Sequence, residues 1–338
     1  MEIGTEFLMR AASGLPFDDI RNLLSGLPGP DKERWVKTRD EAAARAWPVA
    51  AFGRLAPMAE WLAAWQAEGP MVLRPLLAVF ASTHGAAARG LAPAGEPDTQ
   101  KQVELMAAGG APVNQIALDI GMGLKVFDLA LDMPTPDIGE EDALDEPACA
   151  ATMAFGMEAI AGGADLLCLG AAGSGNRAVA AALAAALFGG RAEDWLEGLM
   201  PDIADPAKAL VEVALARTQG DKDPLELLRK LGGREMAAIA GAILAARYQR
   251  IPVLLDGFVS TAAAAVLFKA NPRALDHCMA AHSAGPAHDR LLKELGLKPV
   301  LNYAIEAEHG LGAALAASQL KQAVAIIQQT APREDGNN

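Results

Sequence analysis

Cysteines, aromatic side chains and long apolar runs are all scarce in this chain. Its three cysteines, Cys149, Cys168 and Cys278, lie far apart and form no Cys-x-x-Cys pair, which argues against a disulfide framework and predicts buried, reduced thiols. No run approaches the roughly 18 apolar residues of a membrane span, and the N-terminus lacks the basic-then-apolar pattern of a signal peptide. We therefore expect a cytoplasmic protein with no membrane partner.

Positive charge is also in short supply. The chain holds 29 Lys and Arg against 42 Asp and Glu, a net charge of −13. Nucleic acids are bound by clustered basic residues, and no such stripe is found, so no nucleic-acid partner is expected. Among the five histidines, His282 and His288 lie six residues apart across a Gly-Pro turn, a spacing that suits zinc poorly. No metal site is expected.

Aliphatic residues are what the chain has in abundance. Of its 338 residues, 52% are hydrophobic and 5% aromatic, which indicates a globular protein with a core of small side chains and closely packed helices. Short apolar runs at 76–82, 124–132, 164–176 and 251–260 each end at a glycine-rich or polar turn, with helix-like stretches between them.

This alternation predicts the fold class. Runs that are apolar on both faces are typical of buried parallel strands, so we expect a doubly wound α/β domain, with a mostly parallel sheet and helices on both faces. Ligands of such sheets bind at the carboxyl ends of the strands, and the four turns should therefore face one crevice.

Three segments follow from this pattern. Residues 1–66 form an N-terminal helical segment in which Asp31 is a candidate N-cap, 67–300 form the α/β domain, and 301–338 form a loop and a helix. The first residues, MEIGTEF, look vector-derived, and the tail PREDGNN is expected to be disordered.

One glycine turn, GAAGSGNR at 170–177, has the spacing of a phosphate loop. Asn176 and Arg177 stand where the Lys and Ser/Thr of an NTPase should be, which argues against binding and hydrolysis of a nucleoside triphosphate. The motif is not the nucleophile elbow of a hydrolase either, because it lacks the pattern G-x-S-x-G. The motif suits either a monophosphate bound at a helix N-terminus or a tight turn that only needs small residues.

A titratable trio, Glu306, Glu308 and His309, precedes a second glycine turn in EAEHGLGAALAAS. Such a trio is compatible with a solvated loop and an acidic helix entry, which the helix dipole favours, or with catalytic residues. In LLDGF, Asp256 is predicted to cap the helix that follows it.

Taken in order, these pieces resemble one family, the nicotinate-nucleotide:dimethylbenzimidazole phosphoribosyltransferases. The matching segments are LPGPD, FGRL, HG at 84–85, AAGGAPVN, GADLLCLGAAGSGN, LGGREMAAIAGAILAA, PVLLDGFVSTAAA, HSAG and GLGAALA. The resemblance implies a doubly wound α/β domain, a smaller helical part built from both ends of the chain, a homodimer, and no cofactor. It also implies that a base nitrogen attacks the ribose carbon that carries nicotinate, so that nicotinate is released.

The resemblance also suggests the site residues. His309 stands where the family has its catalytic Glu, just before the G-x-G turn, and Glu308 would assist it. The residues expected to hold phosphate and ribose are Gly173, Gly175, Asn176, Lys208 and Ser283. The residues expected to line the base side are Thr83, His84, Ala171 and Leu311.

Three positions depart from the family pattern, because Thr83, Ala171 and His309 each replace a carboxylate that the resemblance leads us to expect. Histidine can still accept a proton near neutral pH. The main expectation is therefore transfer of phosphoribosyl from nicotinate mononucleotide to a benzimidazole-type base. The alternatives are a catalytically impaired paralogue that binds a nucleotide or base as a sensor or partner subunit, and a phosphoribosyl transferase that uses a different base.

Overall fold

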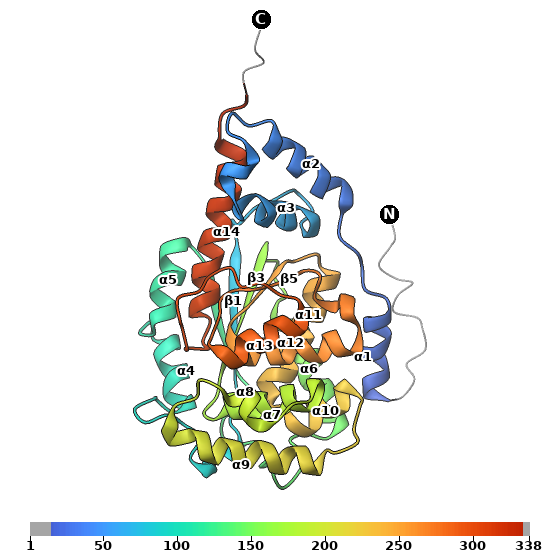
Figure 1. Cartoon of the computed structure of the whole chain (residues 1–338), viewed down its shortest axis with the longest axis vertical. Coiled ribbons are helices and arrows are strands. Elements are labelled where there is room, and N and C mark those ends of the chain that lie inside the picture. The colour runs from blue at the N-terminus through green and yellow to red at the C-terminus, as the bar shows by residue number, and fades with distance from the viewer. Residues whose placement is uncertain (1–14, 334–338) are drawn as a thin grey trace, which may run out of the picture.

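A five-stranded parallel sheet forms the centre of the protein, whose computed structural model describes residues 15–333 (Figure 1). The strand order is β2-β1-β3-β4-β5. The strands are β1 Pro75–Ala81, β2 Gly123–Asp128, β3 Leu166–Ala172, β4 Val253–Leu255 and β5 Cys278–Ala280. The vector-like start at residues 1–7 and most of the predicted disordered tail lie outside the described residues.

The helices connect and cover these strands. They are α1 Pro16–Ser25, α2 Lys32–Ala43, α3 Leu55–Trp65, α4 Thr99–Ala107, α5 Pro112–Ile120, α6 Glu146–Ala159, α7 Asn176–Phe188, α8 Ala192–Leu196, α9 Pro201–Arg217, α10 Pro224–Leu231, α11 Arg234–Tyr248, α12 Gly257–Ala270, α13 Pro286–Leu295 and α14 Leu311–Gln329. Short 3-10 turns lie at Val49–Phe52, Gly85–Arg89 and Pro272–Leu275. No helix within residues 15–333 is both long enough and apolar enough to cross a bilayer.

Helices cover both faces of the sheet, which confirms the predicted doubly wound α/β fold. Side chains alternate along a strand, so Leu77 and Val79 of β1 pack with α3, α4, α5 and α14. Ala78 and Phe80 point the other way and pack with α6, α7 and α9 to α12.

Each of the first four strands falls in one of the predicted apolar runs, with β1 and β2 each starting one residue earlier. One run is a strand over only part of its length, and a fifth strand was missed. The run at 251–260 is a strand only at Val253–Leu255, and helix α12 begins at Gly257. An apolar stretch that is buried as strand and then as helix has no periodicity that separates the two. Strand β5 has only three residues, Cys278–Ala280, too few to show a pattern.

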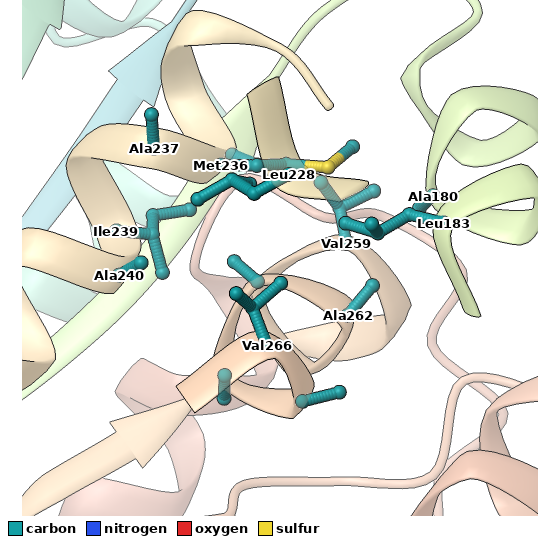
Figure 2. Close-up of a cluster of buried hydrophobic side chains, with 14 of the residues drawn as sticks. Ala180, Leu183, Leu228, Met236, Ala237, Ile239, Ala240, Val259, Ala262 and Val266 are labelled. Carbon is teal, nitrogen blue, oxygen red and sulfur yellow. The ribbon is translucent and has the colours of Figure 1, made fainter. Parts of the chain in front are cut away.

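The core is built from the small side chains that the composition predicts. Figure 2 shows Val259, Ala262 and Val266 of α12 packed among side chains of α7, α10 and α11. Helices α6 and α11 approach so closely that a Cβ on Gly156 or Gly241 would collide with backbone of the facing helix.

The two ends of the chain meet in space. Ala42, Ala56, Ala59 and Ile327 form a small buried cluster that joins α2, α3 and α14, and Figure 1 shows α14 beside the N-terminal helices. Asp31 accepts a hydrogen bond from Arg34 N at 3.0 Å, so the predicted N-cap of α2 is confirmed. The division into three segments stays a prediction.

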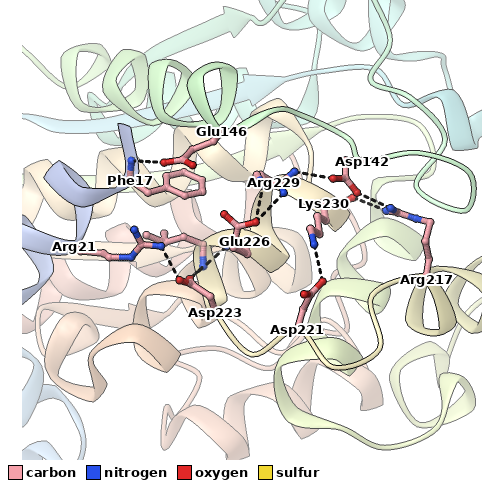
Figure 3. A network of polar contacts seen from close by, with 11 residues as sticks. Phe17, Arg21, Asp142, Glu146, Arg217, Asp221, Asp223, Glu226, Arg229 and Lys230 are labelled. Carbon is pink, nitrogen blue, oxygen red and sulfur yellow. Dashed lines mark hydrogen bonds and ion pairs between the residues drawn. The ribbon is translucent and has the colours of Figure 1, made fainter. Parts of the chain in front are cut away.

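An ion-pair network holds the loop after β2 against two helices (Figure 3). Asp142 accepts hydrogen bonds from Arg217 of α9 and from Arg229 of α10, the latter at 2.7 Å. Burial would raise the pKa of Asp142, but the two guanidinium groups outweigh it and hold that pKa below its ordinary value.

Candidate active site

Two cavities meet at His309. The glycine-turn cavity has a volume of about 380 Å³, and the apolar cavity has a volume of about 190 Å³. The glycine-turn cavity is lined by Leu91, Pro93, Ala94, Glu96, Ala171, Gly173, Gly175, Asn176, Arg177, Gly198, Leu199, Met200, Ile203, Glu306, Ala307, Glu308 and His309. The apolar cavity is lined by Pro97, Gln102, Leu105, Met106, Gly110, Ala111, Pro112, Val113, Ala307, His309 and Leu311.

Helix α7 begins at the glycine turn after β3. Gly175 has the left-handed φ of 79°, and a Cβ on Gly173 would lie 2.9 Å from the Ser82 carbonyl oxygen, so both positions require glycine. The N-terminus of α7 attracts anions through its dipole and free N–H groups. Of the four predicted turns, all of them within the described residues, only this one lines either cavity. The expectation that all four share a crevice is therefore wrong.

A positive charge stands beside this turn. Arg177 lines the glycine-turn cavity, and its Nη2 donates to the Ala284 carbonyl oxygen at 3.0 Å. Its Nε is buried and has no hydrogen-bond partner among the residues described. The guanidinium therefore retains a donor that no described protein group uses.

His309 is held through its own side chain and through the backbone of the next residue. Its Nε2 lies 3.0 Å from Gln102 Oε1 on α4. The next residue, Gly310, has a φ of 91°, and its N–H donates to Asp256 Oδ2 at 2.7 Å. Burial lowers the pKa of His309 below its ordinary value, so the imidazole is neutral at neutral pH.

Asp256 and Glu308 cap each other's helix. Asp256 precedes α12, yet its Oδ1 accepts from Ala313 N of α14 at 2.7 Å. Glu308 precedes α14, and its carboxylate accepts from Phe258 N and Val259 N of α12 at 3.1 and 2.8 Å. The prediction that Asp256 caps the helix after it is therefore wrong, because Glu308 occupies those N–H groups.

The crossed caps also limit what Glu308 can do chemically. Burial raises the pKa of Glu308, opposed by the nearby Arg177 and by the two N–H donors. Both carboxylate oxygens already accept hydrogen bonds from the backbone of α12. The side chain therefore serves α12, and the predicted assistance to His309 stays a prediction.

Two residues predicted for the base side, Thr83 and His84, have partners outside the two cavities, and their contact with the base stays a prediction. His84 Nε2 is 3.0 Å from Glu235 Oε1 in a fully buried pair, and the Ser82 hydroxyl donates to the other oxygen of Glu235. Thr83 Oγ1 donates to the Leu131 carbonyl oxygen at 3.0 Å. Neither His84 nor Thr83 lines either cavity.

Of the remaining predicted residues, some line one of the two cavities and others do not. Ala171 lines the glycine-turn cavity, and Leu311 lines the apolar cavity. Ser283 is buried and its backbone N–H donates to Leu301 O. Lys208 is half-exposed and pairs with Glu193 at 2.6 Å. Neither Ser283 nor Lys208 lines either of these cavities, and their contact with phosphate stays a prediction.

Sequence reasoning missed the side chains that surround the imidazole. Gln102 is buried and contacts His309 directly, and Glu96 hydrogen bonds to Gln102 at 3.2 Å. The apolar spacing of residues 99–107 marks α4 as a half-buried helix, but no local pattern distinguishes Gln102 from an ordinary surface amide. Within residues 15–333, no group of three or more metal-ligating side chains is placed to hold an ion.

Comparison with known proteins connects this geometry to an enzyme family. A family model described as phosphoribosyltransferase matches residues 27–337. The nicotinate-nucleotide–dimethylbenzimidazole phosphoribosyltransferase of Rhizobium etli (strain CIAT 652) is 54% identical over 320 residues, which cover 93% of this chain and 95% of that one. The enzyme of the same name from Brucella anthropi is 53% identical over 321 residues, 93% of this chain and 94% of that one.

A solved structure supports the same family assignment. The crystal structure of the phosphoribosyltransferase with that specificity in its title, from Thermus thermophilus, aligns with a TM-score of 0.81 and 32% identity. The alignment covers 89% of this chain and 97% of that one.

Proposed function

Because this chain belongs to the nicotinate-nucleotide–dimethylbenzimidazole phosphoribosyltransferase family, we propose that it transfers phosphoribosyl from nicotinate mononucleotide to a benzimidazole-type base. The product would be the nucleotide of a cobamide lower ligand. The observation that carries this proposal is the place of His309, which lines both the glycine-turn cavity and the apolar cavity.

The two cavities fit the two substrates. The glycine-turn cavity combines the α7 N-terminus with Arg177, which suits the phosphate of the mononucleotide. The apolar cavity is lined by Leu105, Met106 and Val113 among others, which suits a flat aromatic base. A base seated there would meet the ribose at His309.

The reaction requires little beyond alignment and one proton acceptor. The lone pair of one base nitrogen forms a bond to the ribose carbon, and the bond from that carbon to the pyridine nitrogen breaks with its electron pair leaving on nicotinate. The leaving ring already carries positive charge, so positioning supplies much of the rate. The N–H proton on the second base nitrogen passes to neutral His309, which acts as general base.

Turnover and binding can be measured separately. Titration calorimetry with nicotinate mononucleotide, followed by chromatography for free nicotinate after adding 5,6-dimethylbenzimidazole, tests each in turn. His309→Ala is expected to lower kcat by roughly 10²- to 10⁴-fold, the usual worth of a general base, while mononucleotide binding persists. Glu104→Ala, on the exposed side of α4, should leave both unchanged.

Other outcomes would change the assignment. Binding without turnover in the wild type would indicate a nucleotide-holding relative that serves as a sensor or partner subunit. Turnover only with purines or phenols would indicate a different base. Full activity in His309→Ala would remove the proton acceptor from the mechanism.

A homodimer is part of the same proposal. The family resemblance supports it, and Trp35 and Trp47 are 41% and 63% exposed in the N-terminal segment, which gives an apolar surface that a second copy could cover. Light scattering on the purified protein should return twice the mass of one chain. A single-chain mass at micromolar concentration would contradict it.

A further inference from the structure

The side chain of Gln102 is fixed in one orientation beside His309. It is buried on α4, and its Nε2 donates to the Pro97 carbonyl oxygen at 2.8 Å and to Glu96 Oε1 at 3.2 Å. A backbone carbonyl can only accept a hydrogen bond. Rotating the amide by half a turn would bring two oxygens together, so Oε1 must be the atom that faces His309.

This orientation decides where the imidazole proton lies. Gln102 Oε1 is 3.0 Å from His309 Nε2, and an amide oxygen can only accept, so Nε2 carries a hydrogen. A neutral imidazole has a single N–H, and Nδ1 therefore holds the free lone pair. No group in residues 15–333 hydrogen bonds to Nδ1.

We propose that Gln102 is a positioning residue that holds His309 as the Nε2–H tautomer and so makes Nδ1 the atom that accepts the proton during phosphoribosyl transfer. This inference rests on the function proposed above. In the step itself, the base N–H bond breaks and a new N–H bond forms at Nδ1. The imidazolium keeps its Nε2–H hydrogen bond to Gln102, whose amide is in turn oriented by Glu96 and Pro97.

The charges around the ring favour this cycle. Glu96, Glu306 and Glu308 line the same cavity as His309, and Asp256 lies behind the turn and binds Gly310 N. Of these, Asp256 raises the pKa of His309 against the larger effect of burial. It therefore stabilises a transient imidazolium, while burial keeps the resting ring neutral. The amide dipole of Gln102 adds stabilisation without introducing a competing charge.

Ring-nitrogen NMR reads the tautomer without any turnover. In protein labelled with ¹⁵N at histidine rings, His309 is identified by the signals that vanish in His309→Gln. Wild type at neutral pH should show a protonated Nε2 and an unprotonated Nδ1. Gln102→Leu should remove that preference and give a mixture of tautomers, whereas Gln100→Leu, an exposed residue on the same helix, should match wild type.

Kinetics then test the consequence. Gln102→Leu is expected to lower kcat by about 10-fold or more, short of the full loss of a general base, with a smaller effect on KM for the mononucleotide.

Two results would overturn the inference. One is an Nδ1–H tautomer in the wild type, and the other is an unchanged ring spectrum in Gln102→Leu. If the tautomer behaves as expected but no variant or wild type turns over, the proposed function fails while the role of Gln102 in orienting the ring stands.

Discussion

Asp256 and Glu308, which lie far apart in the sequence, exchange helix caps, each satisfying the N–H groups of the helix that the other introduces. Hydrogen bonds to charged groups contribute about 1.5–3 kcal/mol each. Asp256→Ala leaves Gly310 N and Ala313 N without their acceptor, so we expect a loss of a few kcal/mol of unfolding free energy and a displaced His309. Denaturant unfolding and the nicotinate-release assay would measure the two effects.

An ordinary N-cap provides the matched control for that change. Asp31 caps α2 through Arg34 N at 3.0 Å and lines neither active-site cavity. Asp31→Ala should cost about 1 kcal/mol of stability with kcat unchanged. If Asp256→Ala behaves in the same way, the crossed caps do not position His309.

Arg177 brings a positive charge to the cavity beside the glycine turn. Arg177→Met keeps most of the side-chain length but removes the charge, and we expect affinity for nicotinate mononucleotide to fall about 10- to 100-fold, the worth of one charged hydrogen bond. Nicotinate riboside lacks the phosphate and should bind wild type and variant alike. Arg191→Met, with a side chain 77% exposed, is the control; equal losses in both variants would argue against a phosphate contact.

A histidine as the proposed general base has a consequence for pH. Burial holds the pKa of His309 below its ordinary value of 6.5, so the neutral, proton-accepting form persists below that pH. The acid limb of kcat/KM should therefore fall below pH 6.5 and reflect protonation of the ring. His309→Glu should retain turnover and give a different acid limb, whereas His309→Gln should lose turnover. Superimposable pH profiles for the wild type and His309→Glu would show that another group titrates.

Gly156 lies where helix α6 touches the backbone of Ala238 on α11. Alanine is a better helix former than glycine by about 1 kcal/mol, but here its Cβ would collide with a carbonyl that cannot move cheaply. Gly156→Ala is therefore expected to cost about 1–3 kcal/mol net, as overpacked cores do, with a lower Tm. At Gly123 an added Cβ would lie 3.5 Å from Leu76 Cδ1, so Gly123→Ala should be tolerated and serves as the comparison.

The fold was largely predictable from sequence because apolar runs and turns repeat along the chain. β1 and β3 are buried on nearly every residue, the pattern on which that prediction depends. Strand β2 lies at the edge of the sheet and is half-exposed, yet its position was still found from the turn that follows it. Strand β5 was missed because three residues carry no periodicity.

The candidate site was predictable only where the residues of one sequence motif themselves line a cavity. The glycine turn and the residues before α14 belong to that class, and both line a cavity. Local rules assign a cap to the nearest helix, so they cannot reveal that Asp256 serves α14. The pairing of His84 with Glu235 spans 151 positions, and the contact of Gln102 with His309 spans 207. Such contacts depend on the completed fold.

The crossed caps also make the order of synthesis matter. Asp256 emerges from the ribosome well before α14, and until Gly310 and Ala313 follow, its carboxylate has no helix to hold. The wall formed by residues 306–309 is likewise missing from both cavities until then. A growing chain can therefore place all five strands before α14 follows, and the two cavities gain their last wall only then.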